Sequence, residues 1–491
     1  MTKADSNKYK KKSYSSFTRI IFPIIVLTQS CSNISAITDE SKNIVVPEQW
    51  QTEASTNIIS SESHDTFDPW VKDFKDEPLI AAIKVALANN HDLQSQAINV
   101  SLAKERLAVS NASDFPELSL STNNTRSKTL SENTETYQTS ANIKLNLSYE
   151  VDIWGQLSDK QQQQQLAYAS ANSLYQHQKL TLVTNVIKGW YNLIEAQKLL
   201  NLYQERADNL VKNLNMIESS YKLGLNNALD VYLTKNNVNS ELARVAQQKQ
   251  TVKESARSLE LLLGDYPKGT IHADSVFPKI NTELHIEKPA LLLTRRNDIA
   301  SSWFGLLSLD AALAVAHKQR FPRLALTGTY GDSGRELTDL FSGNPLTWSL
   351  IGNLTAPIFN GGTLASLEEQ ARLEVVKKEQ EYLAQVSSAF AQVENLMSKR
   401  KSLIERLLYS KEAQVNAIEA QTLSFNQYMR GLVTYTTVLE SERRAFDAQT
   451  TLIQLTNQLL QNRADSYLAL GGGLKSNLLD DESHPSNIQE Q

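Results

Sequence analysis

Two short stretches of the chain alternate between apolar and polar side chains with a period of two. The apolar positions are Ile143, Leu145, Leu147 and Tyr149 in the first stretch, and Leu346, Trp348, Leu350 and Leu354 in the second. A period of two predicts β-strands with one apolar and one polar face. A Phe-Pro pair precedes each stretch, and proline is tolerated as the first residue of a strand, so further strands should begin at Pro116 and Pro322. The polar segments 122–139 and 331–345 are predicted as loops, which gives two β-hairpins.

Longer segments of the chain follow a helical spacing instead. Residues 363–430 contain neither Gly nor Pro, and residues 156–223 contain only Gly189. Apolar residues that recur every three or four positions predict a coiled-coil seam in the second segment: Tyr382, Val386, Ala389, Val393, Leu396, Ile404 and Leu407. Roughly 60 helical residues reach about 90 Å. Shorter helices are predicted at 77–111, 229–264, 286–317 and 434–470.

The second half of the chain repeats the first. FPELSL at 115–120 returns as FPRLAL at 321–326, an offset of 206, and LSYEVDIWGQL at 147–157 returns as LTAPIFNGGTL at 354–364, an offset of 207. The offset of 207 also joins YKLGL at 221–225 to YMRGL at 428–432, and Leu263-Gly264 to Leu470-Gly471. Several blocks in one order at nearly one offset indicate a tandem duplication of a unit of about 200 residues.

The first thirty residues have a different character. Basic residues precede IIFPIIVL at 20–27, an apolar core that is too short to cross a bilayer and is typical of a secretory signal. Cys31, the only cysteine, follows at once and resembles a lipoprotein cleavage box, although Thr28 stands where a leucine is usual. Ser32, which is not an aspartate, resembles the choice made for sorting to the outer membrane. The alternative is a spare cysteine after ordinary signal cleavage.

The repeat and the signal together divide the chain into five segments. Residues 1–30 are predicted as a signal peptide, 31–68 as a lipid-anchored linker, 69–284 as the first repeat, 285–471 as the second, and 472–491 as a flexible tail. The signal carries six cationic residues and one acidic residue, so its removal takes the formal net charge from -5 to about -10. So acidic a chain is not expected to bind nucleic acid.

The amphipathic hairpins point to a membrane. On a secreted, lipid-anchored chain, such strands can satisfy their backbone groups in a bilayer only as a closed barrel. No segment after the signal offers about 18 uninterrupted apolar residues, so helices are not expected to cross the membrane. Two repeats supply four strands, and a small barrel needs roughly eight, so several chains must contribute. The alternative is a soluble four-stranded sheet whose apolar face packs on the helices.

The residues at the strand-to-helix junctions and at the helical turns resemble a known family. LSYEVDIWGQL, LTAPIFNGGTL, LLLTRRNDI with FPRLALTGTYG, and the two Tyr-x-x-Gly-Leu turns are similar to the TolC-like outer membrane factors of tripartite efflux systems, in their NodT and OprM type lipoprotein branch. Asn297 departs from the family, which commonly has a proline there. The resemblance covers nearly the whole mature chain. It implies a mixed α/β membrane protein, a homotrimer whose twelve-stranded barrel lies in the outer membrane and whose coiled-coil helices form a periplasmic tube.

The same resemblance implies a function and its partners. The chain would be a passive exit duct for small molecules that a periplasmic adaptor and an inner-membrane pump deliver. The helix after the second turn would line the closed end of the tube with Glu440 and Arg443, although the family more often has Asp at the first position. Asp230 in the first turn is a weaker candidate for this pore gate, because Thr437 is its partner in the repeat. The alternatives are an ordinary solvated ion pair and a helix-capping carboxylate.

Two further groups of residues follow from the junctions and the turns. Gly224, Leu225, Gly431 and Leu432 resemble the tips on which the adaptor docks, and the alternative for both leucines is packing within a Schellman-type helix end. Asp152, Trp154, Gly155, Gly361 and Gly362 are assigned to the junctions between barrel and helix, with Trp154 either in an aromatic belt at the membrane interface or in ordinary packing.

Catalysis finds no support in the sequence. The seven histidines are scattered without ligand spacing, and neither a phosphate-binding Gly-rich loop nor a nucleophile elbow is present, so no cofactor or metal is predicted. Two rival functions remain open at this point. One is a duct for protein secretion of type I, and the other is a periplasmic coiled-coil scaffold lipoprotein without a pore. A scaffold would have no need of a lipid-facing alternation in both repeats.

Overall fold

A computed structural model describes residues 35–38, 47, 49–51, 69–72, 74–131, 134–225, 227–273, 276–278, 289–336, 338 and 346–472. These residues fall into two compact units. One contains Val109–Gln163 and Leu309–Val376 and carries the β-sheet, and the other contains Thr38–Ala108, Gln164–Ser308 and Lys377–Gln491 and is helical. The signal segment, Cys31 and most of the linker and tail lie outside the described residues.

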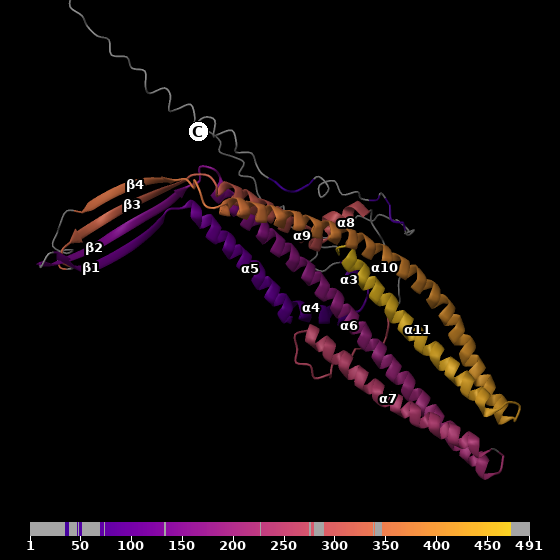
Figure 1. Cartoon of the computed structure of the whole chain (residues 1–491). Coiled ribbons are helices and arrows are strands. Elements are labelled where there is room, and N and C mark those ends of the chain that lie inside the picture. The colour runs from indigo at the N-terminus through magenta and orange to yellow at the C-terminus, as the bar shows by residue number, and fades with distance from the viewer. Residues whose placement is uncertain are drawn as a thin grey trace, which may run out of the picture. The chain divides into compact units, whose positions relative to one another are not determined.

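The order of the elements repeats along the chain (Figure 1). The first repeat comprises α3 (Pro69–Lys72), α4 (Glu77–Asn89), α5 (His91–Asn111), the 3-10 turn η2 (Ala112–Asp114), β1 (Glu117–Ser131), β2 (Thr134–Val151), α6 (Gln156–Lys222) and α7 (Ala228–Leu262). The second comprises α8 (Pro289–Arg295), α9 (Asn297–Lys318), β3 (Arg323–Gly334), β4 (Thr347–Thr355), α10 (Thr363–Met429) and α11 (Tyr435–Ala469). Each repeat therefore holds a β-hairpin followed by a long helical hairpin.

The four strands form one antiparallel sheet in the order β1-β2-β3-β4. The expected loop at 122–139 is wrong, because β1 and β2 run through it and pair without interruption from Glu117 with Ser148 to Ser131 with Thr134. This segment lacks apolar alternation, yet its backbone groups are satisfied by the neighbouring strand and its many threonines suit a strand. The loop at 331–345 begins later than predicted, since β3 continues to Gly334. Both hairpins start one residue after the proline, which has no N–H to donate.

Two of the four shorter helices of the prediction are each broken once, and the other two, α7 and α11, are continuous. Residues 77–111 divide at Asn90 into α4 and α5, and the described part of 286–317, which begins at Pro289, divides at Arg296 into α8 and α9. The Asn90 side chain caps α5 by accepting from the Leu93 N–H at 2.9 Å, and its amide donates to the Leu262 carbonyl at 3.0 Å. Arg296 makes the equivalent bond in the second repeat, to the Ala469 carbonyl at 3.1 Å. At both breaks, a polar side chain therefore donates to the last residue of a later helix, α7 in the first repeat and α11 in the second.

The long helices match the prediction closely. α6 and α10 have 67 residues each, and α7 and α11 have 35 each. The expected seam of α10 is buried at Tyr382, Val386, Ala389 and Val393, which pack with Leu292 and Ile299 of α8 and α9. Leu396, Ile404 and Leu407 are only partly buried. The largest apolar core lies between α4, α6 and the end of α7 and includes Leu79, Ile187, Tyr191 and Leu259.

One described helix has the length and composition to cross a membrane. It is α9, with 22 residues and a mean hydropathy of 1.6. Its residues Ile299, Leu306 and Leu313 are fully buried inside the chain. A core helix passes the same test of length and composition, so this finding is weak evidence for a membrane span.

Candidate functional site

The turns between the long helices have the same geometry in both repeats. Gly224 lies two residues after the end of α6 and has a φ of 74°, and Gly431 lies two residues after the end of α10 and has a φ of 72°. The N–H of Gly224 donates to the Tyr221 carbonyl and that of Leu225 to the Ser220 carbonyl, both at 2.9 Å. These two bonds define a Schellman motif, and Gly431 and Leu432 make the equivalent pair. The cap does not cover its leucines, since Leu225 is 74% exposed and Leu432 is 69% exposed.

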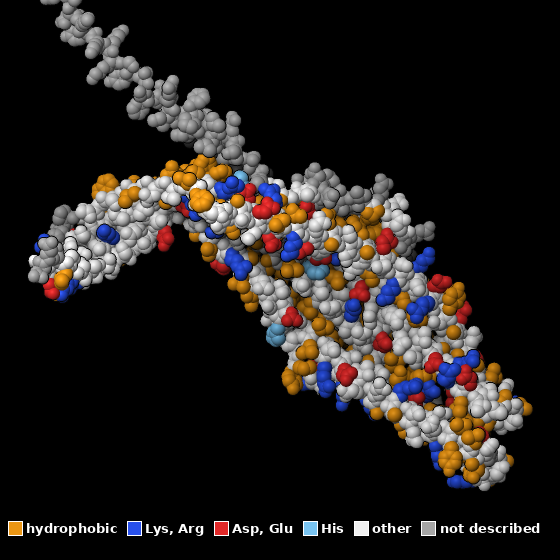
Figure 2. All heavy atoms as spheres, viewed as in Figure 1, with side chains coloured by type: hydrophobic (Ala, Val, Ile, Leu, Met, Phe, Trp, Pro, Cys, Tyr) orange, Lys and Arg blue, Asp and Glu red, His pale blue; other side chains and the backbone are white. Residues whose placement is uncertain are grey.

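Further apolar side chains surround these turns. Leu223, Leu229 and Tyr232 are also exposed near the α6–α7 turn, and hydrophobic side chains are visible at the ends of both helical hairpins in Figure 2. Below the surface, Ile217, Val231, Tyr435 and Val438 form a small buried cluster from α6, α7 and α11. The tips are therefore packed inside and apolar at the surface, and exposed apolar patches are typical of interaction sites.

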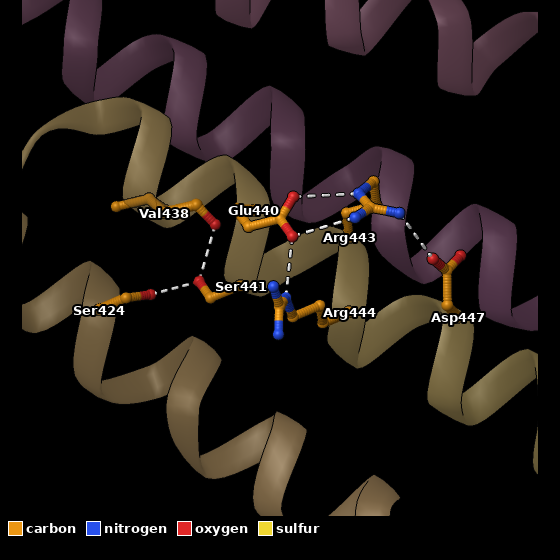
Figure 3. Close-up of polar contacts among 7 residues, drawn as sticks. All are labelled: Ser424, Val438, Glu440, Ser441, Arg443, Arg444 and Asp447. Atoms are coloured by element: carbon orange, nitrogen blue, oxygen red, sulfur yellow. Dashed lines mark hydrogen bonds and ion pairs between the residues drawn. The ribbon is translucent and has the colours of Figure 1, made fainter.

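Glu440 lies at the centre of an exposed charge cluster on α11. Its carboxylate accepts from Arg443 Nε at 3.1 Å, from Arg443 Nη2 at 3.0 Å and from Arg444 Nε at 2.8 Å (Figure 3). Arg443 also donates to Asp447 at 3.3 Å. The hydrogen bonds from Arg443 and Arg444 lower the pKa of Glu440 to about 2, so this carboxylate is charged at every physiological pH. Two carboxylates and two guanidinium groups make the cluster formally neutral.

A serine pair joins this part of α11 to the helix before it. Ser441 and Ser424 lie 2.5 Å apart between their hydroxyl oxygens, and the Ser441 hydroxyl also donates to the Val438 carbonyl at 2.8 Å (Figure 3). The short polar contact fixes α11 against α10 one residue after Glu440. The structure thus places Glu440 and Arg443 on one face, as their spacing of three predicted, and adds Arg444 and Asp447 to them.

Asp230 lies apart from that cluster. It is in the first turn of α7, and its carboxylate accepts from the Tyr428 hydroxyl of α10 at 3.3 Å. Burial and the neighbouring Asp230 carboxylate raise the pKa of Tyr428 to about 12, so the phenol stays protonated and can donate. No described contact joins Asp230 to Glu440. Asp230 therefore connects the two helical turns to each other.

The sequence prediction missed a buried charged group on the same helix. Glu442 is buried, and its carboxylate accepts from the Asn213 amide of α6 at 2.9 Å. Burial raises the pKa of this carboxyl. Nearby, the Arg206 guanidinium lies 4.0 Å from the Phe446 ring centroid and 3.6 Å from Glu241. The spacing of Val438, Glu442 and Ala445 was the available signal, because it puts all three on the buried seam.

The first junction is held by Asp152 and Trp154. The Asp152 carboxylate accepts from the N–H of Leu157 at 3.1 Å and from the N–H and hydroxyl of Ser158 at 2.9 and 2.8 Å, so it caps the start of α6. Partial burial opposes ionisation, but these hydrogen bonds outweigh it and the pKa of Asp152 lies below its ordinary value. The Trp154 indole donates to the Pro322 carbonyl at 2.7 Å and packs on Phe321 at 5.5 Å. Trp154 therefore makes the contacts that its packing alternative predicts.

Glycines follow at both junctions, in different surroundings. Gly155 has a φ of 74°, and its carbonyl accepts from Lys318, which also pairs with Asp159 at 2.6 Å. Gly361 and Gly362 have φ values of 63° and 85°, with open space around them. The second junction therefore has neither the acidic cap nor the indole of the first.

Removing the Asp152 carboxylate should loosen the start of α6. An N-cap carboxylate contributes about 1 kcal/mol, so Asp152→Ala should speed hydrogen exchange of the backbone amides at 157 and 158 roughly fivefold. Mass spectrometry of exchanged peptides measures this locally. Asp152→Ser is the matched control, since serine can also cap, and it should exchange nearly as slowly as the parent. Equal exchange in the alanine variant and the parent would contradict the capping role.

Comparisons with known proteins agree with this geometry. The family model described as "Outer membrane efflux protein" matches residues 82–265 and 289–472. The chain is 28% identical over 409 residues to the solvent efflux pump outer membrane protein SrpC of Pseudomonas putida, covering 82% of this chain and 86% of that protein. It is 26% identical to the probable outer membrane lipoprotein SilC of Salmonella typhimurium, over 82% of this chain and 88% of that one.

A solved structure has the same fold. The CmeC outer membrane channel of Campylobacter jejuni superposes with a TM-score of 0.80, covering 90% of this chain and 96% of that chain at 22% identity. At this identity the likeness concerns the fold alone. The sheet of four strands and the long helical hairpins are therefore the architecture of a known outer membrane channel.

Proposed function

The chain belongs to the outer membrane efflux protein family, and from this premise we propose that it is the passive exit duct of a tripartite efflux system. Three copies would close one barrel in the outer membrane and one helical tube in the periplasm. A periplasmic adaptor and an inner-membrane pump would deliver small molecules to the tube. The pump would supply the energy, and the duct itself would carry out no reaction and need no cofactor.

The exposed apolar face of the sheet carries this proposal. Leu120, Leu145, Tyr330 and Trp348 lie in a row across the four strands, and all four are exposed, Trp348 to 76%. A soluble sheet would bury such a row, whereas a barrel turns it to lipid. Four strands cannot close, but three copies supply twelve. The exposed row also disfavours the scaffold without a pore.

The apolar tips are proposed to receive the adaptor. Leu225 and Leu432 stand in equivalent positions of the two repeats, so three copies would present six similar contact points. Gly224 and Gly431 allow the left-handed turn that exposes each leucine. An adaptor with apolar helical hairpins would match this surface.

The charge cluster around Glu440 is proposed as the gate of the tube. In a trimer, three such clusters would face one another where the helices converge, with Arg443 holding each carboxylate in place. Asp230 is proposed to assist by holding the α7 start to Tyr428, so that both turns move together. Charged rings at a constriction set both its width and its ion selectivity.

Lipidation at Cys31 is proposed to anchor the chain in the outer membrane. Cys31 is four residues from Ser35, so at most about 14 Å of chain separates them. The Ser35 hydroxyl and the Ala36 N–H donate to Asp310 of α9 at 2.9 and 3.0 Å. The Thr38 N–H donates to Glu379 of α10 at 2.8 Å. These carboxylates hold the segment that follows the anchor.

Conductance in a planar bilayer tests the duct. The purified full-length protein should insert and give small single-channel steps that are closed most of the time, because the gate rests shut without its partners. Size determination of the same preparation should give a trimer. A preparation that is well folded by circular dichroism but neither inserts nor trimerises would overturn the proposal in favour of the scaffold.

A further inference from the structure

The inference concerns the two outer edges of the sheet, and it rests on the proposed function. Within the described residues, no strand lies beside the outer edge of β1 or of β4. Long unpaired edges expose a row of N–H and C=O groups that are ready to pair with another chain. The pairing of β2 with β3 inside the chain joins the first repeat to the second. It therefore offers a template for joining the second repeat of one copy to the first repeat of the next.

The repeat offsets carry the strand register. β1 corresponds to β3 at an offset of 206, and β2 corresponds to β4 at an offset of 207. In the first hairpin, Leu118 pairs with Leu147. Adding 206 and 207 to these positions gives Leu324 and Leu354, which are paired in the second hairpin. The duplication has thus preserved the register of the hairpin to the residue.

We infer that β4 of one copy pairs antiparallel with β1 of the next copy, in the register that these offsets carry over from β2 and β3. Ile143 pairs with Asp332 inside the chain, so Leu350 should face Arg126 of the next copy. In the same way, Lys144 opposite Gly331 places Ile351 opposite Thr125. The occupant of both edges is a second copy of this chain.

The two faces of the sheet agree with this register. Leu118 and Leu120 share one face of β1 with Arg126, because side chains alternate with a period of two. Leu350 lies on the apolar row of β4, and it faces Arg126, which is on the apolar side of β1. A slip of one residue would turn the apolar side of β4 against the polar side of β1. A slip of two residues would keep the apolar sides of β4 and β1 together, so the faces alone would allow it. The repeat offsets select one register among these.

Three exposed apolar side chains flank the two outer strands, one just before β1 and two just after β4. At the first junction, Trp154 covers Phe321. At the second, Gly361 stands in the place of Trp154, while Phe115, the counterpart of Phe321, is 73% exposed. Ile358 and Phe359, which precede Gly361, are 97% and 91% exposed.

The inferred register brings these side chains together. Val151 faces Leu324 inside the chain, so Ile358 should face Leu118 of the next copy, three residues from Phe115. The exposed Ile358 and Phe359 of one copy would then cover Phe115 of the next. This contact between copies would correspond to the packing of Trp154 on Phe321 within one copy.

Cysteine pairs on the two edges test the register. Leu350→Cys with Arg126→Cys, and Ile351→Cys with Thr125→Cys, place two thiols on opposite edges of the sheet of one chain. The two edges are already about 14 Å apart, and the paired positions are also offset along the strands, so the thiols cannot bridge internally. One of the two pairs is a hydrogen-bonded position and the other is not, so both ladder geometries are sampled. Copper-catalysed oxidation in outer membrane vesicles should give covalent dimers and trimers on a non-reducing gel.

Register-shifted pairs provide the matched controls. Leu350→Cys with Asn124→Cys or with Lys128→Cys shifts the partner by two residues on the same face, and each should cross-link roughly fivefold less than the inferred pair. The pair Ile143→Cys with Asp332→Cys reports correct folding, because its disulfide forms inside one chain. The parent, whose only cysteine is Cys31, should give no bridged oligomer.

The outcomes separate this inference from the function on which it rests. Preferred bridging at Leu350 and Arg126, or at Ile351 and Thr125, supports the register. Preferred bridging in a shifted pair overturns the register and leaves the trimeric duct standing. Absence of bridged oligomers in every pair, while the parent still conducts, overturns the inferred register. Absence of both bridging and conductance overturns the proposed function as well.

Discussion

Glu440→Ala should open the channel. The cluster of Glu440, Arg443, Arg444 and Asp447 is formally neutral, and removing one carboxylate leaves the cluster of each copy with a charge of +1. In a trimer, three positive clusters would converge at one constriction and repel one another, which favours a wider aperture. The open fraction in single-channel records should rise several-fold, and the preference for cations should fall.

Two controls separate a gate from a general loss of charge. Glu412→Ala removes another exposed glutamate, on α10, and should leave the open fraction unchanged. Lowering the pH from 7 to 4 should not imitate Glu440→Ala, because the pKa of Glu440 is lowered to about 2 and its charge is lost only as the pH falls through that value. Equal conductance of the parent and the Glu440 variant in inserted trimers would place the gate elsewhere.

Gly264→Ala should strongly destabilise the helical unit. Gly264 follows α7 with a φ of 78°, and a Cβ added there would lie 2.4 Å from the Asn89 carbonyl oxygen. Left-handed backbone alone costs alanine about 1 kcal/mol, and the clash with a fixed backbone atom should bring the total to about 3 kcal/mol or more. The denaturant midpoint of the helical circular dichroism signal should fall accordingly.

Gly224→Ala is a matched control for that substitution. Its φ of 74° imposes the same strain, but nothing lies within 4 Å of an added Cβ, so only the cost of about 1 kcal/mol is expected. Gly471→Ala should behave like Gly264→Ala, since its Cβ would lie 2.8 Å from the Arg295 carbonyl oxygen. Equal losses in Gly264→Ala and Gly224→Ala would show that close backbone approach is not what fixes the glycine.

Local sequence patterns were enough to predict the long helices, the apolar strands and part of the candidate gate. Periods of two and of three to four residues located the apolar strands and the long helices, because both depend on which face of an element is buried. The same spacing put Glu440 and Arg443 on one helical face. It gave no reason to add Arg444, and Glu442 was overlooked because a carboxylate on a buried seam is uncommon.

Other features depend on contacts that no local pattern contains. β1 and β2 continue through a polar segment, since each strand satisfies the backbone of the other. The helices break at Asn90 and Arg296, where each side chain reaches a carbonyl more than 170 residues away. The Leu-Gly pairs at 263–264 and 470–471 stood out as repeated, and the structure gives the reason in the neighbouring backbone carbonyl.

By itself, the sequence determined the duplication, the hairpins, the long helices and the family, because these are recorded in repeated blocks and in periodic burial. Only the tertiary structure decided which helix ends meet, which carboxylates cap or lie buried, and which apolar side chains remain uncovered. Hydrogen bonds and close packing between distant segments set those features. The register inferred for β4 and β1 of neighbouring copies needs both sources. The structure gives the pairing of β2 with β3, and the sequence gives the repeat offsets that extend this pairing to a second copy.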